Sequence, residues 1–315
     1  MPDEKIPLLA VEGPTASGKT ALGVLLAEYF DGEVVSADSM QIYEGMSIAT
    51  AKPTQEEMRG IPHHLIGFLK MNEAFSVADY VKLAGDVIRD IHQRGKLPIV
   101  VGGTGLYISS LIDNIQFCQS QSNPKLREEL TAFAEKYGKE ALHARLSGID
   151  PEAAAAIHPN NVIRVVRALE VCIATGEKFS VHKARSRMAE SPYKSCIIGL
   201  DYRERSDLYS RIDNRVDAMI ESGLAEEAYE VWKNGGLLTA SNAIGYKELV
   251  PYFEGTRSLE ECIDEIKLQT RHYAKRQLTW FRKNEHIDWV ILDKSDNLKK
   301  IQENCLKVIA KRKIL

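Results

Sequence analysis

The run Gly-Pro-Thr-Ala-Ser-Gly-Lys-Thr at residues 13–20 restricts the fold of this chain more than any other stretch. An apolar run at residues 8–11 precedes it, and a helix-like run at residues 21–27 follows it. The glycines let successive backbone N–H groups turn toward an anion, and the start of the next helix adds a partial positive charge. A strand, this spacing and a helix, in that order, predict a phosphate-binding loop.

Two side chains of this loop have predicted roles. Lys19 supplies a mobile positive charge, and Thr20 supplies a hydroxyl group suited to Mg²⁺. We expect a diphosphate or a nucleotide to contact the whole loop, which consists of Gly13, Pro14, Thr15, Ala16, Ser17, Gly18, Lys19 and Thr20. Because most loops of this kind bind ATP or GTP, a kinase or an NTPase is the first hypothesis.

The strand-to-helix pattern repeats in the N-terminal part of the chain. Residues 32–36 form a β-branched run that leads to Asp38, and residues 97–101 form a buried strand that ends in a glycine-rich turn. Between them, residues 76–94 carry apolar side chains at helical spacing, with Ser76 as the cap. This order predicts an α/β fold: a P-loop NTPase-like parallel sheet core flanked by helices. Asp38 would lie at the edge of the sheet where such folds bind ligands.

The pattern becomes helical at about residue 116 and returns to a strand at residues 195–201. We therefore predict an inserted all-helical domain at residues 116–194, between core segments 1–115 and 195–315. In the last segment, apolar residues recur at helical spacing over residues 207–231, and two further helices flank a strand at residues 289–292.

The composition is that of a globular protein without a membrane span. The chain has 315 residues, of which 44% are hydrophobic and 27% are charged. No apolar run approaches the roughly 18 residues that a membrane helix needs. Residues 1–5 lack the pattern of a signal peptide, and the cysteines are far apart in the sequence. We expect a cytoplasmic protein with buried, unpaired cysteines. His63 and His64 are interpreted as structural.

The distribution of charge suggests a polyanion site. The net charge is −3 and the pI is near 6.3, which argues weakly against nucleic-acid binding. Residues 271–283 nevertheless contain five Lys or Arg and no acid, and residues 158–187 contain six Lys or Arg against two acids. Two local basic stretches in an acidic protein predict contact with a polyanion. Trp280, Phe281 and Trp289 are expected to be core residues.

The sequence leaves several roles open for Asp38. A kinase needs an acid at a strand end to hold Mg²⁺, and Asp38 could serve, but the strand at residues 97–101 ends without an acid. If the loop holds a diphosphate that departs, Asp38 could instead be the base for the nucleophile. Asp38 could also cap the strand end. The helix predicted at residues 207–231 contains Arg211. We expect this residue to form a surface ion pair with Asp207.

Seven segments, spread over nearly the whole chain, resemble the ordered signature blocks of the bacterial tRNA dimethylallyltransferase family. They are residues 13–20, DSMQIY at 38–43, ATAKP at 49–53, PHHL at 62–65, VGGTGLY at 101–107, RALE at 167–170 and KRQLTW at 275–280. The resemblance implies a P-loop core with a helical insertion. It also implies transfer of a dimethylallyl group from dimethylallyl diphosphate to N6 of the adenosine 3′ of the anticodon, in tRNAs that read codons beginning with U.

The resemblance also assigns roles to individual residues. It implies that Asp38 accepts the N6 proton, and that Thr104 and Arg215 stabilise the departing diphosphate, with Mg²⁺ on Thr20. Because an anticodon-loop base is stacked, it has to flip out to reach the diphosphate. The implied tRNA contacts are Asp38, Ser39, Met40, Gln41, Ile163, Arg164, Val165, Val166, Arg167, Asn242, Gly245, Tyr246, Lys247, Lys275 and Arg276.

Two other functions stay open at this point. One is a small-molecule or nucleotide kinase that uses ATP in the same loop. The other is an RNA-binding module regulated by a nucleotide, which would bind tRNA without forming a product. The expected partners of the favoured enzyme are the tRNA anticodon stem-loop and dimethylallyl diphosphate, with no membrane. Nothing in the sequence demands an oligomer, so a monomer is expected.

Overall fold

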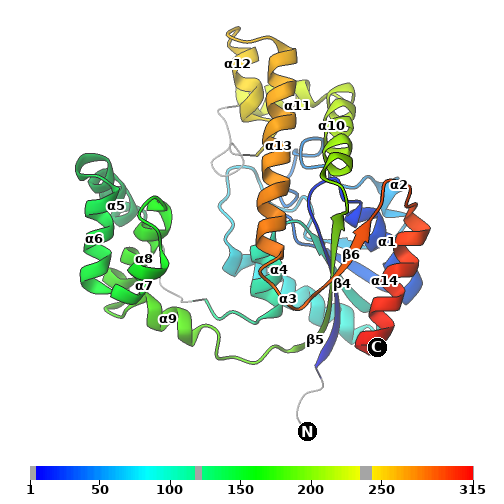
Figure 1. The fold of residues 1–315 in the computed structure, drawn as a ribbon, viewed down its shortest axis with the longest axis horizontal. Helices are drawn as coiled ribbons and strands as arrows, with labels where there is room; N and C mark the ends of the chain where they lie inside the picture. Colours follow the sequence, from blue (N-terminus) through cyan, green and yellow to red (C-terminus); the bar gives the residue numbers. More distant parts are fainter. Residues whose placement is uncertain (1–4, 118–122, 235–242, 315) are drawn as a thin grey trace. The chain divides into compact units, whose positions relative to one another are not determined.

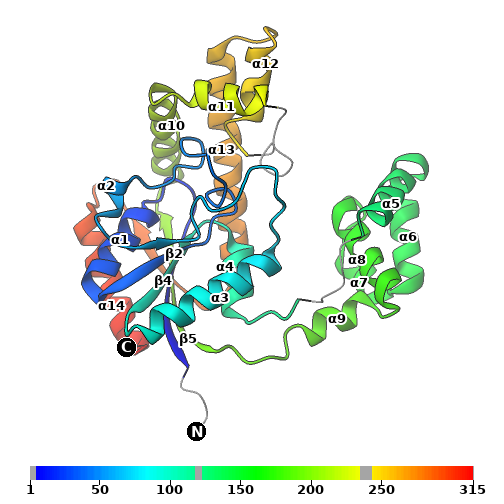
Figure 2. The same ribbon diagram turned by 180° about the vertical axis from the view of Figure 1, so that it is seen from behind.

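The computed structural model describes residues 5–117, 123–234 and 243–314. The chain divides into two compact units, a core unit formed by Met1–Ile112 with Ser191–Leu315, and an insertion unit formed by Asp113–Glu190 (Figures 1 and 2). The insertion was predicted at residues 116–194. Residues 193 and 194 instead belong to a core strand, because the backbone N–H of Ile6 donates to Pro192 O and extends the sheet pairing.

The core unit is built on one parallel sheet of six strands in the order β3-β2-β4-β1-β5-β6. The strands are β1 (Ile6–Glu12), β2 (Gly32–Ser36), β3 (His63–His64), β4 (Leu97–Gly102), β5 (Tyr193–Tyr202) and β6 (Ile287–Leu292). Because β1 pairs with β4 on one side and with β5 on the other, the loop that follows β1 lies at the centre of the sheet edge. This is where open α/β sheets bind ligands.

Helices cover both faces of this sheet, as the α/β prediction requires (Figures 1 and 2). Leu9 and Val11 of β1 pack toward α1 (Lys19–Phe30) and α14 (Leu298–Arg312). Leu8 and Ala10, which point to the opposite face, pack toward α3 (Val77–Gln93) and α4 (Gly105–Ile112). The alternation along β1 therefore supplies both halves of the core, as period-2 side chains of a buried strand do.

A third cluster of buried side chains lies beyond the sheet, among helices of the C-terminal segment. It involves α10 (Arg205–Glu221), α11 (Leu224–Lys233), the short helices η2 (Lys247–Leu249) and α12 (Val250–Phe253), and α13 (Leu259–Phe281). The loop after β2 joins it through Ile42, Tyr43 and Met46, ahead of α2 (Gln55–Met58). The loop is thereby fixed against helices that lie about 200 residues later in the sequence.

Local sequence signals explain the helix boundaries. Ser76 and Ser258 cap α3 and α13, each with an acid three residues later that completes a capping box. The four described cysteines are buried and free, which confirms the prediction for them, whereas Cys118 lies outside the described residues. In the described part of the chain, no helix is long and apolar enough to cross a bilayer.

The insertion unit is helical, as predicted, and has a core of its own. Its helices are α5 (Pro124–Tyr137), α6 (Lys139–Ile149), α7 (Pro151–Ala156), α8 (Val162–Thr175) and α9 (Phe179–Arg185). Gly148 lies inside α6, which continues to Ile149. The break that separates α5 from α6 is at Gly138, whose φ of 90° favours glycine.

Candidate active site

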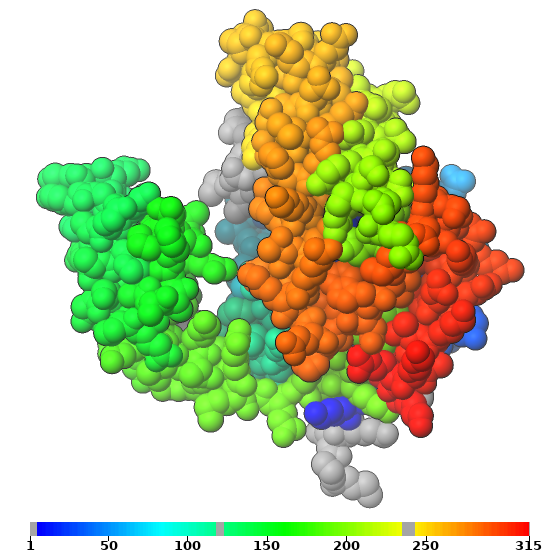
Figure 3. Space-filling model, viewed as in Figure 1, coloured from blue at the N-terminus to red at the C-terminus, as the bar shows by residue number. Residues whose placement is uncertain are grey.

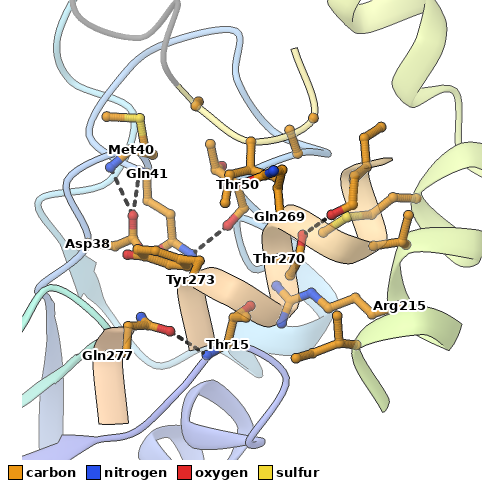
Figure 4. A pocket seen from close by; sticks show the side chains of 18 of the residues that line it. Thr15, Asp38, Met40, Gln41, Thr50, Arg215, Gln269, Thr270, Tyr273 and Gln277 are labelled. Carbon is orange, nitrogen blue, oxygen red and sulfur yellow. Dashed lines mark hydrogen bonds between the residues drawn. The ribbon is translucent and has the colours of Figure 1, made fainter. Parts of the chain in front are cut away.

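A cavity of about 330 Å³ opens at the carboxyl edge of the sheet in the core unit (Figure 4). The phosphate loop, the loop after β2, residues 243–245 and Lys247 contribute to its lining. Two helices complete the lining with side chains at helical spacing. From α10 these are Ile212, Arg215, Val216 and Met219, and from α13 they are Ile266, Gln269, Thr270, Tyr273, Arg276 and Gln277. The lining combines polar and apolar side chains, which suits an amphipathic ligand.

The phosphate loop has the backbone geometry that its sequence predicts. Gly18 caps α1 with a φ of 85°, a conformation that favours glycine, and Ser17 N donates to Pro14 O at 3.2 Å. Thr15, Lys19 and Thr20 line the cavity. Lys19 Nζ donates to Pro14 O at 3.3 Å, so this cation lies over the loop.

Gln277 of α13 forms hydrogen bonds with the phosphate loop, a role that the sequence did not predict. Thr15 N donates to Gln277 Oε1 at 2.9 Å, and Gln277 Nε2 donates to Gly103 O at the same distance. One backbone N–H that was expected to contact a diphosphate is therefore already bonded. Gln277 instead ties the phosphate loop to the glycine-rich turn after β4.

Two cations of the site have altered acidity. Burial is the main cause that lowers the pKa of Lys19 to about 8, and Arg215 lowers it further, whereas Asp38 opposes the shift. Burial also lowers the pKa of Arg215. Burial thus disfavours the charged form of both side chains, and a bound anion would favour it. This electrostatic arrangement suits a diphosphate.

Asp38 lies beside these cations with one oxygen engaged. Its Oδ1 accepts hydrogen bonds from Met40 N at 2.8 Å and Gln41 N at 3.3 Å, whereas no donor among the described residues reaches Oδ2. The nearby phenol of Tyr273 has a raised pKa because of burial and of the Asp38 charge. The carboxylate therefore caps the turn after β2 and keeps an oxygen available for a ligand in the cavity.

Thr104 supports this turn. Its backbone N–H donates to Ala37 O at 3.1 Å, and its Oγ1 accepts from Ser39 N at 3.0 Å. Within the described part of the chain, Thr104 is not among the residues that line the cavity. Thr104 was predicted to contact the diphosphate. In the structure its side chain instead contacts Ser39, the residue after Asp38.

Gln41 points along the wall of the cavity, but its side-chain amide is already bonded. Ser36 Oγ donates to Gln41 Oε1 at 3.1 Å, and Gln41 Nε2 donates to the carbonyl oxygens of Thr50 and Ala51. To contact a base edge, as predicted, Gln41 would have to give up these bonds. In this structure it connects the loop after β2 to the segment at residues 50–51.

Glu227 of α11 fixes the backbone of residues 47–49, next to the cavity wall at Thr50. The sequence did not predict this role. Its carboxylate accepts hydrogen bonds from three successive backbone N–H groups, those of Ser47, Ile48 and Ala49, at 2.9 to 3.2 Å. It also accepts from Tyr246 Oη at 2.7 Å. Tyr246 is therefore a buried structural residue, which corrects its prediction as a tRNA contact. Gly245 and Lys247 beside it do line the cavity, and Asn242 lies outside the described residues.

The predicted tRNA contacts in the insertion unit separate into two groups. Val165 is 0% exposed and Val166 is 6% exposed, because both belong to the core of that unit. Their prediction as contacts is wrong, since a helix must bury one face. Arg167 pairs with buried Glu170 at 2.6 Å. Ile163, which is 83% exposed, and Arg164 lie on the open face of α8.

Two further predictions need correction. Arg211 does not pair with Asp207, because its Nε donates to Ala16 O of the phosphate loop at 3.1 Å. Phe281 is buried as expected, whereas Trp280 is 37% exposed on the outer face of α13. His64 donates to or accepts from Glu33 and His63 contacts Ile61 O, which fits the structural interpretation of both.

The residues of the cavity fit a magnesium ion that is held partly by its substrate. The Thr20 hydroxyl and the Asp38 carboxylate line the same cavity, and the described residues contain no group of three or more His, Cys, Asp or Glu that could hold a metal alone. Mg²⁺ is commonly bound by one or two protein oxygens together with phosphate oxygens and water.

The sequence indicates a polar face on α13, although it does not show which loop that face meets. Thr270, Tyr273 and Gln277 follow one another on α13 at spacings of three and four residues. Polar side chains at that spacing share one face and indicate a lined cavity when the face is not exposed. Glu227 carried no such signal, because its partners are backbone groups about 180 residues away.

Comparison with known proteins agrees with this site. The family model for IPP transferase matches residues 41–284. A tRNA dimethylallyltransferase of Thermoanaerobacter sp. (strain X514) is 47% identical over 308 residues, which are 97% of this chain and 98% of that protein. The crystal structure of a tRNA isopentenylpyrophosphate transferase from Bacillus halodurans is 46% identical with a TM-score of 0.71, and the match covers 98% of each chain.

A more distant structure has the same fold. It is a eukaryotic dimethylallyltransferase described as acting on tRNA, 31% identical with a TM-score of 0.80, and the match covers 96% of this chain and 77% of that one. These comparisons support a prenyl-transferring enzyme and not the ATP-dependent kinase. The chain belongs to the IPP transferase family, alongside the tRNA dimethylallyltransferases.

Proposed function

We propose that this enzyme transfers the dimethylallyl group of dimethylallyl diphosphate to N6 of the adenosine 3′ of the anticodon, in tRNAs that read codons beginning with U. One observation carries the proposal. A single cavity joins a phosphate loop and two buried cations to a carboxylate with an available oxygen and to an apolar wall. The apolar wall includes Val216, Met219 and Ile266, which suit a short branched hydrocarbon tail.

The charges of the cavity match the charges of the reaction. When the N6 lone pair attacks C1 of the allyl group, the C1–O bond breaks and the electron pair leaves with the diphosphate. Lys19 and Arg215 lie where that negative charge develops, and preorganised cations in a buried site are worth several kcal/mol to such a step. The proton of N6 passes to Asp38, which has Oδ2 free to accept it.

Magnesium would assist the leaving group. We assign Thr20 as a protein ligand, with the diphosphate oxygens completing the set. When bound, the ion supplies positive charge for the departing oxygens.

The reactive adenosine has to leave its stack to enter the cavity. Ser39, Met40 and Gly245 form part of the wall that it would contact, and the exposed Lys247 and Arg276 lie at the same lining. Unstacking costs a few kcal/mol, which contacts in the cavity have to offset. We assign the anticodon stem-loop as the partner of this surface, and Ile163 and Arg164 of the insertion unit as further contacts.

The role of Asp38 can be tested with Asp38→Asn, which keeps the shape of the side chain but removes its basicity. With an unmodified anticodon stem-loop and dimethylallyl diphosphate, we expect the single-turnover rate to fall at least ~100-fold, the lower end of what general base catalysis supplies. RNA affinity should stay within about threefold of wild type. Asp86→Asn, an exposed acid on α3, is the matched control. A wild-type rate in Asp38→Asn would exclude Asp38 as the general base.

A further inference from the structure

Two arginines on α10, one helical turn apart, meet the phosphate loop in different ways. Arg215 projects into the active-site cavity, as Figure 4 shows, whereas Arg211 is not among the lining residues in the described part of the chain. The Nε of Arg211 donates to Ala16 O of the phosphate loop at 3.1 Å. Arg211 therefore holds the backbone of the loop without entering the cavity.

Ala16 adopts a backbone conformation that its own side chain disfavours. Its φ is 62°, and within residues 13–20 it is the non-glycine residue in the left-handed region. A Cβ atom is crowded by the following carbonyl oxygen in this region, so glycine is the usual occupant. Gly18, with a φ of 85°, bears no such cost. Left-handed residues in a turn help to bring successive N–H groups together around an anion, so the binding shape is strained at Ala16.

Contacts with α10 offset this strain. The methyl group of Ala16 is buried, and it belongs to the same core cluster as Leu208 and Ile212 of α10. Arg211 lies on the same side of the helix, because residues three or four positions apart are neighbours there. Its hydrogen bond to the Ala16 carbonyl is charge-assisted, and bonds of this kind are stronger than those between neutral groups. One helix thus engages both the side chain and the carbonyl group of the strained residue.

The guanidinium group of Arg211 is held by an aromatic ring and not by an acid. Its Cζ lies 5.8 Å from the ring centroid of Tyr202, within the range of a cation–π contact. Among the described residues, no acid forms an ion pair with Arg211, whereas Arg203 and Arg205 each pair with an aspartate. Part of the surface of α10, yellow-green in Figure 3, is open in the core unit, and Arg211 is exposed. A substitution at Arg211 should therefore leave the fold intact.

We propose that Arg211 is a positioning residue of the reaction, which keeps Ala16 left-handed and so holds the phosphate loop in its anion-binding shape. The proposal rests on the proposed function, because it takes the diphosphate of the substrate as the ligand of the loop. Without Arg211, part of the protein would leave the left-handed conformation at Ala16. The apparent affinity for a diphosphate then falls in proportion to the fraction that stays competent.

A double-mutant cycle on the full-length protein tests this role, with Arg211→Gln and Ala16→Gly made singly and together. Calorimetry measures the Kd of inorganic diphosphate in the presence of Mg²⁺. We expect Arg211→Gln to raise this Kd about 10-fold, which corresponds to ~1.4 kcal/mol. In the Ala16→Gly background, the same substitution should raise the Kd by less than about threefold, because glycine is left-handed without a steric cost. A loss through charge alone would be equal in both backgrounds.

Steady-state kinetics separate positioning from direct stabilisation of the leaving group. For Arg211→Gln, we expect the KM for dimethylallyl diphosphate to rise about 10-fold with kcat within about threefold of wild type, because saturating ligand selects the competent loop. Arg215→Gln should instead lower kcat, because Arg215 lies where negative charge develops. Arg89→Gln, which removes an exposed charge on α3, is the matched control and should keep both constants.

Amide hydrogen exchange of the free protein supplies a measurement that needs no ligand. The hydrogen bond from Ser17 N to Pro14 O closes the loop, and its protection depends on how often the loop opens. Arg211→Gln should speed exchange in the peptide that covers residues 14–19 and leave the peptides of α3 unchanged. Unchanged exchange in α3 shows that the variant is folded.

The outcomes separate the two proposals. If the wild type forms prenylated RNA but Arg211→Gln keeps the wild-type Kd and KM, the inference is overturned. It is also overturned if Arg211→Gln weakens binding equally with and without Ala16→Gly. If Ala16→Gly rescues diphosphate binding in Arg211→Gln while the wild type forms no prenylated RNA, the positioning role stands and the proposed reaction fails.

Discussion

The surroundings of Lys19 lower the pKa of its ammonium group in the absence of a ligand. Its pKa of about 8 results from burial first and from Arg215 second, and Asp38 opposes both. A diphosphate brought next to this ammonium group would favour the protonated form and raise its pKa again. Ligand binding and proton binding are therefore coupled at this residue.

This coupling predicts proton uptake when dimethylallyl diphosphate binds. Near pH 8, about half of Lys19 is neutral in the free protein, so binding should take up part of a proton; near pH 6, Lys19 is already charged and should take up almost none. Calorimetry in buffers of different ionisation enthalpy measures the uptake. Lys19→Arg, which stays charged, corrects for protonation of the ligand. Equal uptake by both proteins at pH 8 would contradict the assignment.

Glu12, at the end of β1, is a buried acid whose pKa is also shifted by burial. Its carboxyl group is 3% exposed, and Oε1 has no hydrogen-bond partner. Burial raises its pKa to about 8, so it is mainly protonated at neutral pH. Glu33 on the neighbouring strand β2 shows the opposite shift, because hydrogen bonds from Arg94 lower its pKa to about 2.

These two shifts predict opposite effects on stability. Glu12 binds its proton more tightly in the folded protein, so it costs stability as pH rises from about 4.5 toward 8, and Glu12→Gln should gain stability relative to wild type over that range. Glu33 stabilises the fold above about pH 4.5, and this contribution is lost as pH falls toward 2. Glu33→Gln should therefore be less stable than wild type at pH 7.

Urea unfolding of both variants checks these signs, from about pH 4.5 to about pH 8.5 for Glu12→Gln and down to about pH 2 for Glu33→Gln. An advantage of Glu12→Gln that does not change with pH would show that the carboxyl group is not protonated in the folded protein. Comparing each variant with wild type at each pH removes the contributions of other titrating groups.

At the scale of elements, one helix determines the shape of a loop far away in the sequence. Glu227 of α11 holds the backbone of residues 47–49, and the next residue, Thr50, lines the cavity and accepts from Gln41. Gly245 packs against Ala49 with a φ of 103°, which favours glycine and allows this close approach. The wall of the cavity thus depends on contacts among three separate segments.

Glu227→Ala should disturb this wall. It leaves three backbone N–H groups and the Tyr246 hydroxyl group without their acceptor, at a cost of ~1–3 kcal/mol for each group that stays buried. We expect a loss of stability in urea unfolding and a lower kcat/KM, with Glu227→Gln intermediate because it keeps one acceptor oxygen. Glu230→Gln, on the exposed face of the same helix, is the control. Wild-type stability and kinetics in Glu227→Ala would show that Glu227 does not maintain this wall of the cavity.

Sequence patterns predicted most elements because those elements depend on local signals. The phosphate loop, the cap at Ser76 and the buried strands each have such a signal. The insertion helix α8 shows the limit. Its basic residues and its apolar residues were predicted together as one contact surface, but the helix turns Val165 and Val166 into the core and leaves Arg164 outside.

At the scale of the whole molecule, the candidate site could be predicted only in part. Asp38, Lys19 and Arg215 were found from motifs and resemblance, and the structure brings them to one cavity. Gln277 and Tyr273 were missed because they come from a helix more than 200 residues after the loop that they complete. Which side chains meet across such a distance depends on the packing of α10 against α13, which no local pattern encodes.

The central claim of this account is prenyl transfer at a phosphate loop, and mass spectrometry of the RNA product tests it most directly. An unmodified anticodon stem-loop with adenosine 3′ of the anticodon is incubated with the enzyme, Mg²⁺ and dimethylallyl diphosphate, beside an identical sample that contains ATP instead. We predict a gain of one dimethylallyl unit on that adenosine in the first sample alone. No gain there, together with ATP turnover in the second sample, would contradict the claim.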